Sequence, residues 1–392
     1  MNTLSFPASL SKIDAQAGLV RVLDRFKQGK FPVELEAAEG SFTAFLLARL
    51  FSANPGVFLV VTPTDREAED LAGDMESLGA PAAILPWWGT MAYREMAPLS
   101  TVFGERARVL GDLALGRPGI VLVPERAFLT PLPPASYIRG LLVKVQTGDT
   151  IDTPALARTL VSYGYTRVPR VQVHGEFALR GEVLDILMGG DEAAVRILFD
   201  FDKVESIRSF DPADQTTIAP DGRERPDCLL IRPLKEVVWT DDRILALSRV
   251  LEGAEEFTNN GKACLEDLMT RRTTAGEELL FPLAFEGGDG KGAAALTDYL
   301  DGGAVVFYLD RERLENAQGS LEREYSGLYR QTRGNANSLA DGRADNSVGG
   351  KAGGRAEDSG REVPAPSRIL LRFEDLANRV ERRVSFMSIR GG

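Results

Sequence analysis

The loop at residues 36–43 joins a predicted strand to a predicted helix, the place where P-loop proteins bind a nucleotide. Such a loop needs glycines that turn backbone N–H groups onto phosphates, a lysine for the β- and γ-phosphates, and a hydroxyl side chain for magnesium. This loop reads E-A-A-E-G-S-F-T, and no lysine occurs between residues 31 and 56. Its two glutamates would also repel a triphosphate. The sequence therefore predicts an ordinary turn in which Ser41 caps the helix. The degenerate loop Glu39, Gly40 and Ser41 is expected to bind no cofactor.

The other reactive side chains offer no replacement for that site. Cys228 and Cys264 lie in unrelated sequence contexts, and His174 is the only histidine, so no ligand set with zinc-site spacing can be assembled. No G-x-S-x-G or similar nucleophile motif accompanies the histidine, and we interpret it as a structural or surface residue. We expect no catalytic residue and no metal in this chain.

Composition narrows the class of protein further. A chain of 392 residues with 44% hydrophobic residues can bury a sizeable core in two or three domains. Its apolar runs are strand-sized, far below the roughly 20 residues of a membrane helix, and its N-terminus lacks a signal-peptide pattern. We therefore expect a cytoplasmic protein without membrane contact. The net charge of −11 gives no general attraction to nucleic acid, and an acidic scaffold with a few exposed arginines suits a protein partner at least as well.

Residues 1–138 alternate helices with strands of continuous apolar character, a pattern typical of an α/β layer with a mostly parallel sheet. The hydrophobic spacing and the breakers predict strands at 31–36, 57–61, 82–85 and 119–123, and helices at 12–27, 41–51, 64–78 and 106–115.

The pattern changes after about residue 140. Strands become shorter and alternate, as in residues 195–201, where the odd positions are apolar, and R-G at 180–181 and G-G-D at 189–191 supply turns. Such strands are typical of antiparallel hairpins with one solvated face. We assign residues 139–233 to an inserted α+β domain.

The last third of the chain is predicted in three parts. Residues 234–330 return to helices with one strand at 304–309, and we assign them to the first domain. Residues 331–366 contain few large aliphatic side chains, which cannot offset the entropy of ordering, so we expect a flexible linker or insertion. Residues 367–392 form a C-terminal strand and tail, with an alternating strand at 369–373 that returns to the first layer.

Two sequence blocks carry a family resemblance. Residues 85–93 read L-P-W-W-G-T-M-A-Y and are followed by an arginine-bearing helix at Arg106 and a buried strand. This block resembles the L-P-x-W-E-T-x-x-Y signature shared by the excision-repair protein UvrB and the transcription-repair coupling factor Mfd, with Gly89 in place of the usual acid. From the residues alone, the aromatic side chains of this block are interpreted as core and lid packing.

The second block is more specific. It consists of H-G-E-F-A-L-R-G-E-V-L-D-I-L at 174–187, R-I-L-F-D-F-D at 196–202 and E-S-I-R-S-F-D-P at 205–212, and it resembles the UvrB interaction domain. The H-G-E triplet favours the coupling factor, because UvrB typically has an arginine before that glycine. The lysine-free loop favours it too, because UvrB keeps a functional nucleotide loop. The resemblance covers about residues 1–330 and, more faintly, 367–376.

The resemblance implies a RecA-like, mostly parallel sheet without a functional P-loop and an inserted domain that binds UvrA. It implies a recruitment module of transcription-coupled nucleotide excision repair that is not an enzyme in this chain. The family's RNA-polymerase-binding domain and ATP-driven DNA translocase are not recognisable here, so ATP and magnesium, RNA polymerase and DNA are expected only for the full-length protein. We expect a monomer that is either a fragment or a truncated product.

The resemblance also suggests which residues bind UvrA, because the family uses exposed arginines and an aromatic on a hairpin. Arg180, the arginine of the R-G pair, is the leading candidate, with Phe177 three positions before it and Arg167 on the strand that leads in. Glu176 and Arg196 complete the predicted set. Arginine and aromatic side chains dominate binding hot spots, since a planar guanidinium pairs bidentately with carboxylates. The alternative is that these residues lie on a solvated sheet face and bind no partner.

Two other functions remain open from the sequence. A divergent helicase-like NTPase with an unusual phosphate loop would hydrolyse ATP, which the lysine-free loop disfavours. A UvrB-related protein that binds damaged DNA is disfavoured by the acidic balance and by the lack of an aromatic-rich hairpin after the nucleotide loop.

Overall fold

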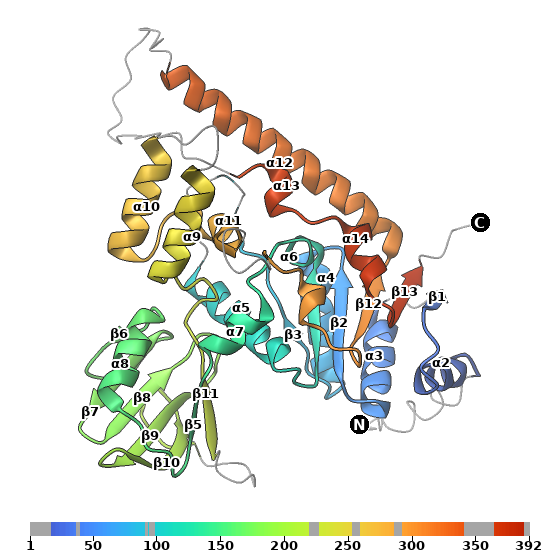
Figure 1. Cartoon of the computed structure of the whole chain (residues 1–392). Helices are drawn as coiled ribbons and strands as arrows, with labels where there is room; N and C mark the ends of the chain where they lie inside the picture. Colours follow the sequence, from blue (N-terminus) through green and yellow to red (C-terminus); the bar gives the residue numbers. More distant parts are fainter. Residues whose placement is uncertain are drawn as a thin grey trace.

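The computed structural model describes residues 17–36, 40–90, 93, 99–218, 227–252, 259–285, 292–340 and 364–387. These residues form one six-stranded sheet, one five-stranded sheet and one two-stranded sheet, surrounded by helices (Figure 1). The prediction of a mixed α/β chain with a parallel and an antiparallel part is confirmed. Within the described ranges, no helix combines the length and apolar character needed to cross a membrane.

The six-stranded sheet is parallel throughout, and its order is β1-β13-β12-β2-β4-β3. Alternate residues of its strands enter different cores: Phe58 and Val60 face one side, and Leu59 and Val61 the other. A strand buried on both faces explains the continuous apolar runs in the sequence. The strands are β1 Val33–Glu36, β2 Val57–Thr62, β3 Ala83–Ile84, β4 Gly119–Pro124, β12 Val305–Leu309 and β13 Arg383–Met387.

Helices cover both faces of this sheet (Figure 1). One face packs on α2 Ala17–Lys27, α3 Ser41–Ala53 and α4 Asp65–Ser77. The other face belongs to a larger hydrophobic core, which also includes side chains of α5 Ser100–Ala114, α6 Glu125–Phe128, α7 Ala135–Leu141, α9 Asp241–Glu252, α10 Asn259–Arg271, α11 Glu277–Leu280, the 3-10 helices Phe281–Phe285 and Leu296–Tyr299, and α12 Arg311–Ala340. Helix α5 begins six residues before the position expected from the sequence.

Helix α12 corrects the predicted start of the linker. It continues to Ala340, so the first ten residues of the segment expected to be flexible, 331–366, are helical. A helix that is already nucleated adds residues at little cost, and only one glycine interrupts this stretch. Residues 341–363 of the predicted linker lie outside the described residues.

The C-terminal segment also differs from the prediction. The expected strand at 369–373 is wrong, because α13 Pro366–Ile369 and α14 Phe373–Arg379 occupy this region. Phe373, Leu376 and Ala377 are buried, and this helical spacing extends beyond the short window that suggested alternation. The segment does return to the first layer, since β13 lies between β1 and β12.

The inserted domain stands apart from the parallel sheet (Figure 1). Its five-stranded sheet has the order β10-β9-β8-β7-β6, in which only β6 and β7 run parallel. Helix α8 Thr153–Ser162 packs on one face. The strands are β6 Thr166–Arg167, β7 Glu176–Arg180, β8 Val183–Leu187, β9 Ala194–Asp200 and β10 Lys203–Phe210; β5 Val143–Gln146 pairs with β11 Cys228–Ile231 beside them.

Candidate functional site

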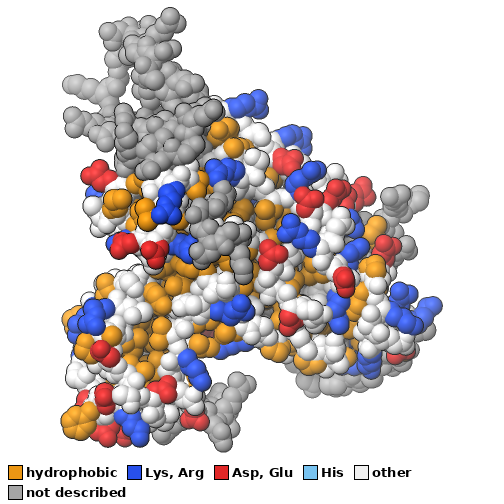
Figure 2. Space-filling model, viewed as in Figure 1, with side chains coloured by type: hydrophobic (Ala, Val, Ile, Leu, Met, Phe, Trp, Pro, Cys, Tyr) orange, Lys and Arg blue, Asp and Glu red, His pale blue; other side chains and the backbone are white. Residues whose placement is uncertain are grey.

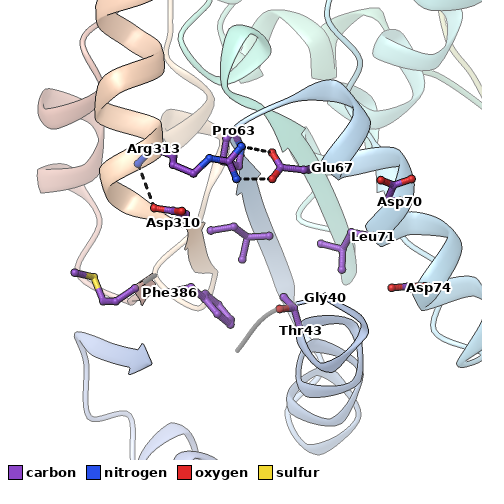
Figure 3. A pocket seen from close by; sticks show the side chains of 12 residues that line it. Gly40, Thr43, Pro63, Glu67, Asp70, Leu71, Asp74, Asp310, Arg313 and Phe386 are labelled. Atoms are coloured by element: carbon purple, nitrogen blue, oxygen red, sulfur yellow. Dashed lines mark hydrogen bonds and ion pairs between the residues drawn. The ribbon is translucent and has the colours of Figure 1, made fainter. Parts of the chain in front are cut away.

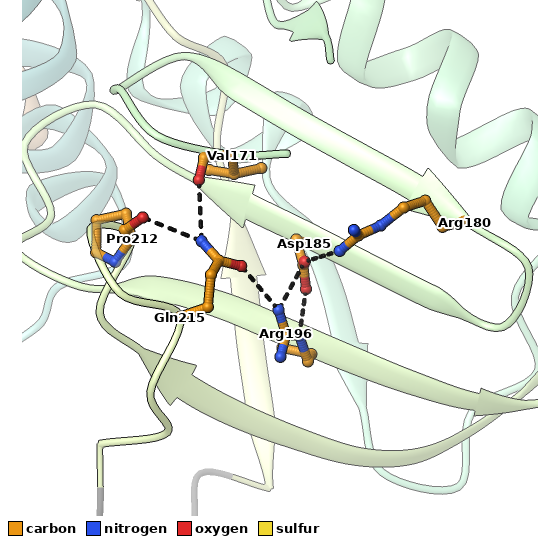
Figure 4. Close-up of polar contacts among 6 residues, drawn as sticks. All are labelled: Val171, Arg180, Asp185, Arg196, Pro212 and Gln215. Carbon is orange, nitrogen blue, oxygen red and sulfur yellow. Dashed lines mark hydrogen bonds and ion pairs between the residues drawn. The ribbon is translucent and has the colours of Figure 1, made fainter. Parts of the chain in front are cut away.

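The face of the inserted sheet opposite α8 carries a cluster of charged side chains around Asp185 (Figure 4). Arg196 donates from Nε and Nη2 to the two oxygens of Asp185 at 2.7 and 2.9 Å. Arg180 donates from Nη2 to the same carboxylate at 2.8 Å. The Asp185 side chain is fully buried, whereas 51% of the Arg180 side chain is exposed. One carboxylate therefore organises two arginines from neighbouring strands, and Arg180 reaches solvent.

Arg196 is held more firmly than Arg180. Its guanidinium lies 4.6 Å from the centre of the Phe210 ring, and its Nη2 also donates to Oε1 of Gln215 at 3.1 Å. The hydrogen bonds that Arg196 donates to Asp185 raise the pKa of the guanidinium above its ordinary value. Only 24% of the side chain is exposed, so Arg196 is mainly a support for this surface.

Gln215 joins the two loops that border the cluster. Its amide nitrogen donates to the carbonyl oxygens of Val171 and Pro212, at 3.2 and 3.0 Å. Beneath these loops lies a small core that contains Ala178, Leu187 and Phe210. The loops cover one part of the sheet and leave the Arg180 part exposed.

A third arginine adds positive charge to this face. Arg208 of β10 lies directly opposite Arg196 of β9 in the sheet register, and like charges in such a pair are unfavourable. The Nε atom of Arg208 is buried and has no hydrogen-bond partner among the described residues. Two arginines thus bind a single carboxylate and a third lies one strand further along the sheet; we call Arg180, Arg196, Arg208 and Asp185 the arginine surface. Its excess of positive charge suits an acidic partner group.

The other predicted polar residues have separate local roles. Exposed Arg167 lies on edge strand β6 and donates from Nη2 to the carbonyl oxygen of Leu179 at 3.2 Å, so it lies close to Arg180. Glu176 accepts hydrogen bonds from the backbone N–H groups of Gln172 and Val173 at 2.8 and 3.0 Å. Its carboxylate therefore orders the loop before β7.

Phe177 does not fit the predicted role. Its side chain is fully buried in the core beneath α8, because the alternation of β7 directs it to the opposite face from Arg180 and Ala178. The exposed aromatic is Phe201, 83% exposed. The predicted strand 195–201 ends at Asp200, and Phe201 occupies the turn with a φ of 57°, a conformation that bulky residues rarely adopt.

Sequence reasoning missed Asp185, Arg208, Gln215 and Phe201. Asp185 carried a usable signal, because a lone acid inside the apolar strand V-L-D-I-L needs a cation on a neighbouring strand. Phe201 carried a weaker one, an aromatic between two aspartates where a hairpin turn was due. Gln215 carried none, since its role depends on loops that meet only in the fold.

A second polar site lies at the carboxyl ends of the parallel strands (Figure 3). A cavity of about 470 Å³ opens there between α3, α4, β12 and β13. The predicted cap of α3 needs correction, because Gly40 is the N-cap residue and Ser41 is the first helical residue. Glu39 lies outside the described residues.

The cavity is predominantly acidic. It is lined by the carboxylates Glu67, Asp70, Asp74 and Asp310 and by one guanidinium, Arg313. Arg313 donates to both oxygens of Glu67, at 2.6 and 3.3 Å, so its charge is already balanced. Among the described residues, no group of three His, Cys, Asp or Glu could hold a metal ion.

The first sequence block forms part of the core. Arg106 is fully buried, pairs with Glu236 at 2.7 Å, donates to the carbonyl oxygen of Pro86 at 2.6 Å and stacks on Trp88 at 3.7 Å. Burial raises the pKa of Glu236, and the Arg106 charge opposes that shift. The expected packing role of the tryptophans is confirmed, since Trp87 is also buried.

Comparison with known proteins agrees with both sequence blocks. Residues 143–222 match the UvrB interaction domain family, so the chain contains a UvrB interaction domain. The chain is 31% identical to the transcription-repair-coupling factor of Mycobacterium bovis over 72% of its length, and 26% identical to that of Borreliella burgdorferi over 67%. These matches span 23% of each relative.

A third relative is the UvrABC system protein B of Kosmotoga olearia, 23% identical over 77% of this chain and 49% of that protein. The resemblance to the coupling factor and to UvrB is thereby confirmed. It spans less than a quarter of the length of the coupling factors described above.

Proposed function

We propose that this chain binds UvrA through the arginine surface and so recruits excision repair to stalled transcription. The observation that carries the proposal is the excess of arginine over carboxylate around Asp185. This cluster lies on a sheet face that α8 leaves free, inside the residues that match the UvrB interaction domain.

In this proposal, the exposure of each side chain determines whether it binds UvrA or supports the residues that do. Arg180 would meet acidic groups of UvrA, because its side chain is half-exposed, and Arg208 would add positive charge beside Arg196. Phe201 would supply the aromatic contact first assigned to Phe177. Arg196 and Asp185 would hold the others in place, since their own donors and acceptors are occupied within the domain.

Nucleotide hydrolysis by the parallel sheet is not part of this proposal. The cavity at its carboxyl edge presents four carboxylates, and its one arginine is paired with Glu67. Such a lining is unfavourable for a triphosphate. In this proposal the ATP-driven motor and the contacts with RNA polymerase and DNA belong to the remainder of the longer relatives, and the chain acts as a monomer in the cytoplasm.

The proposal is tested by a binding titration of the purified chain with UvrA. Arg180→Ala should weaken binding by about tenfold or more, because truncated hot-spot residues typically cost about 2 kcal/mol. The matched control is Arg66→Ala, which removes an equally charged but 88% exposed side chain on α4 and should leave affinity unchanged. Equal binding by both variants would refute the assigned surface.

A further inference from the structure

The inserted domain joins the rest of the chain at only two crossings. The chain enters it after α7, which ends at Leu141, and leaves it after β11, which ends at Ile231. A domain on two such connections is free to pivot unless further contacts hold it. Figure 2 shows hydrophobic side chains gathered between the inserted domain, at the lower left, and the helices α9 and α10 above it. Three specific contacts hold the inserted domain in one orientation relative to the rest of the chain.

The first contact is a close approach of two backbones. A Cβ atom on Gly104 of α5 would lie 2.6 Å from Cα of Gly189, and one on Gly189 would lie 2.6 Å from Cα of Gly104. A side chain on either residue would force the two segments apart, because the atom nearest to the added Cβ is a backbone atom that cannot rotate away. The helix and the loop therefore touch without any intervening side chain.

The second contact is a leucine in a hole lined by glycines. Leu234 follows the second crossing and packs against Gly164, Gly175 and Gly189, where added Cβ atoms would lie 3.6, 2.9 and 3.3 Å from it. Gly175 also has a φ of 83°, which only glycine adopts at little cost. The glycine of the H-G-E triplet thus has a packing role at the domain junction.

The third contact is polar. Arg232 donates to the carbonyl oxygen of Gly189 at 3.0 Å and pairs with Asp191, which fixes the glycine loop. Two residues beyond Leu234, Glu236 pairs with Arg106 of α5 inside the protein. Helix α5 therefore contacts the inserted domain through Gly104 and the segment after the second crossing through Arg106.

We infer that the Gly104–Gly189 contact and the Leu234 knob lock the inserted domain to α5, so that the domain is presented in a single orientation. The inference does not depend on what the arginine surface binds. It predicts one rigid body in solution, and it predicts that a single methyl group at position 104 displaces the domain.

The test is a spin-label distance measurement on the full chain. Val161→Cys on α8 and Glu69→Cys on α4 place labels at exposed positions in a Cys228→Ser background that removes the exposed native thiol. The lock predicts one narrow distance distribution. Gly104→Ala should shift or broaden it by more than its original width, whereas Gly111→Ala in the same helix, where the new methyl meets only a leucine side chain at 3.6 Å, should not.

A broad or multiple distribution in the parent protein would overturn the inference, and so would a Gly104→Ala distribution identical to the parent. If Gly104→Ala does not fold, Leu234→Ala replaces it, because it removes the knob without adding a clash. Broadening in that variant supports the lock, and an unchanged narrow distribution overturns it.

Discussion

The arginine surface lies on a face of the inserted sheet and the acidic cavity at the carboxyl edge of the parallel sheet, and these two charged clusters differ in how their charges are matched. In the cavity, the single arginine is paired with Glu67 and three further carboxylates face the opening. On the inserted sheet, two arginines share one buried carboxylate, and a third, Arg208, lies beside them with an unpaired Nε. The comparison shows that the position of a cavity within a fold does not determine its function. The cavity lies where related folds bind nucleotides, yet the charges favour the other surface.

The largest effect is expected at the centre of the arginine surface. Asp185→Ala removes the carboxylate that three guanidinium N–H groups use, and it leaves Arg196 largely buried without its counter-ion. We expect the free energy of unfolding to fall by about 3 kcal/mol, measured by urea denaturation. The comparable change at the cavity, Asp70→Ala, removes an exposed carboxylate 3.8 Å from Arg66 and should change stability by less than about 0.5 kcal/mol. Equal losses would contradict the contrast between the two clusters.

The parallel-sheet region contains buried carboxyls whose stability contribution depends on pH. Burial raises the pKa of Glu125 to about 8, partly opposed by Arg126 and a backbone hydrogen bond. The folded state therefore holds a proton that the unfolded state releases near pH 4.5, so the stability that this group contributes declines as the pH rises from 4.5 to 8.

Glu125→Gln cannot ionise and should remove this decline. We expect the variant to gain about 3 kcal/mol over the parent between pH 5 and pH 8, as seen in denaturant midpoints across that range. Glu278, whose pKa burial raises to about 7, remains in the variant and leaves a smaller slope. Parallel pH profiles for parent and variant would show that Glu125 does not titrate in this way.

Phe201, in the turn after β9, separates the effect of a substitution on stability from its effect on binding. Because it is exposed and has a positive φ, Phe201→Gly should stabilise the fold by about 1 kcal/mol by relieving backbone strain. The same change should weaken UvrA binding by about tenfold through loss of the aromatic contact. Thermal unfolding and a binding titration measure the two effects. Unchanged affinity would remove Phe201 from the proposed surface.

The smallest effect is expected at the acidic cavity. Magnesium and ATP at millimolar concentration should leave the thermal midpoint within about 1 °C, since a ligand stabilises a fold only in proportion to its occupancy. Differential scanning fluorimetry with and without nucleotide provides the measurement. A rise of several degrees would mean that the four carboxylates do not exclude a triphosphate, and it would revive a divergent NTPase.

The sequence was most informative where one physical rule acts alone. Buried strands such as Val57–Thr62 follow from continuous apolar residues, and the helix capped by Thr64 follows from local capping chemistry. The expectation failed where a side chain's role depends on distant partners. Phe177 was assigned to the surface because hairpin aromatics were expected there, but the pleat of β7 directs it inward. Gln215 became recognisable only when its two loops met in the fold.

The measurement that tests the central claim most directly is competition between this chain and UvrB for UvrA. Residues 143–222 match the interaction domain named for UvrB, so both proteins should occupy one surface of UvrA. Titration of the chain into a complex of UvrA with fluorescent UvrB should displace UvrB completely. The Arg180→Ala chain should need at least about tenfold higher concentration, and the Arg66→Ala chain should match the parent. Retention of UvrB at saturating chain, or equal displacement by the Arg180→Ala chain, would contradict the account.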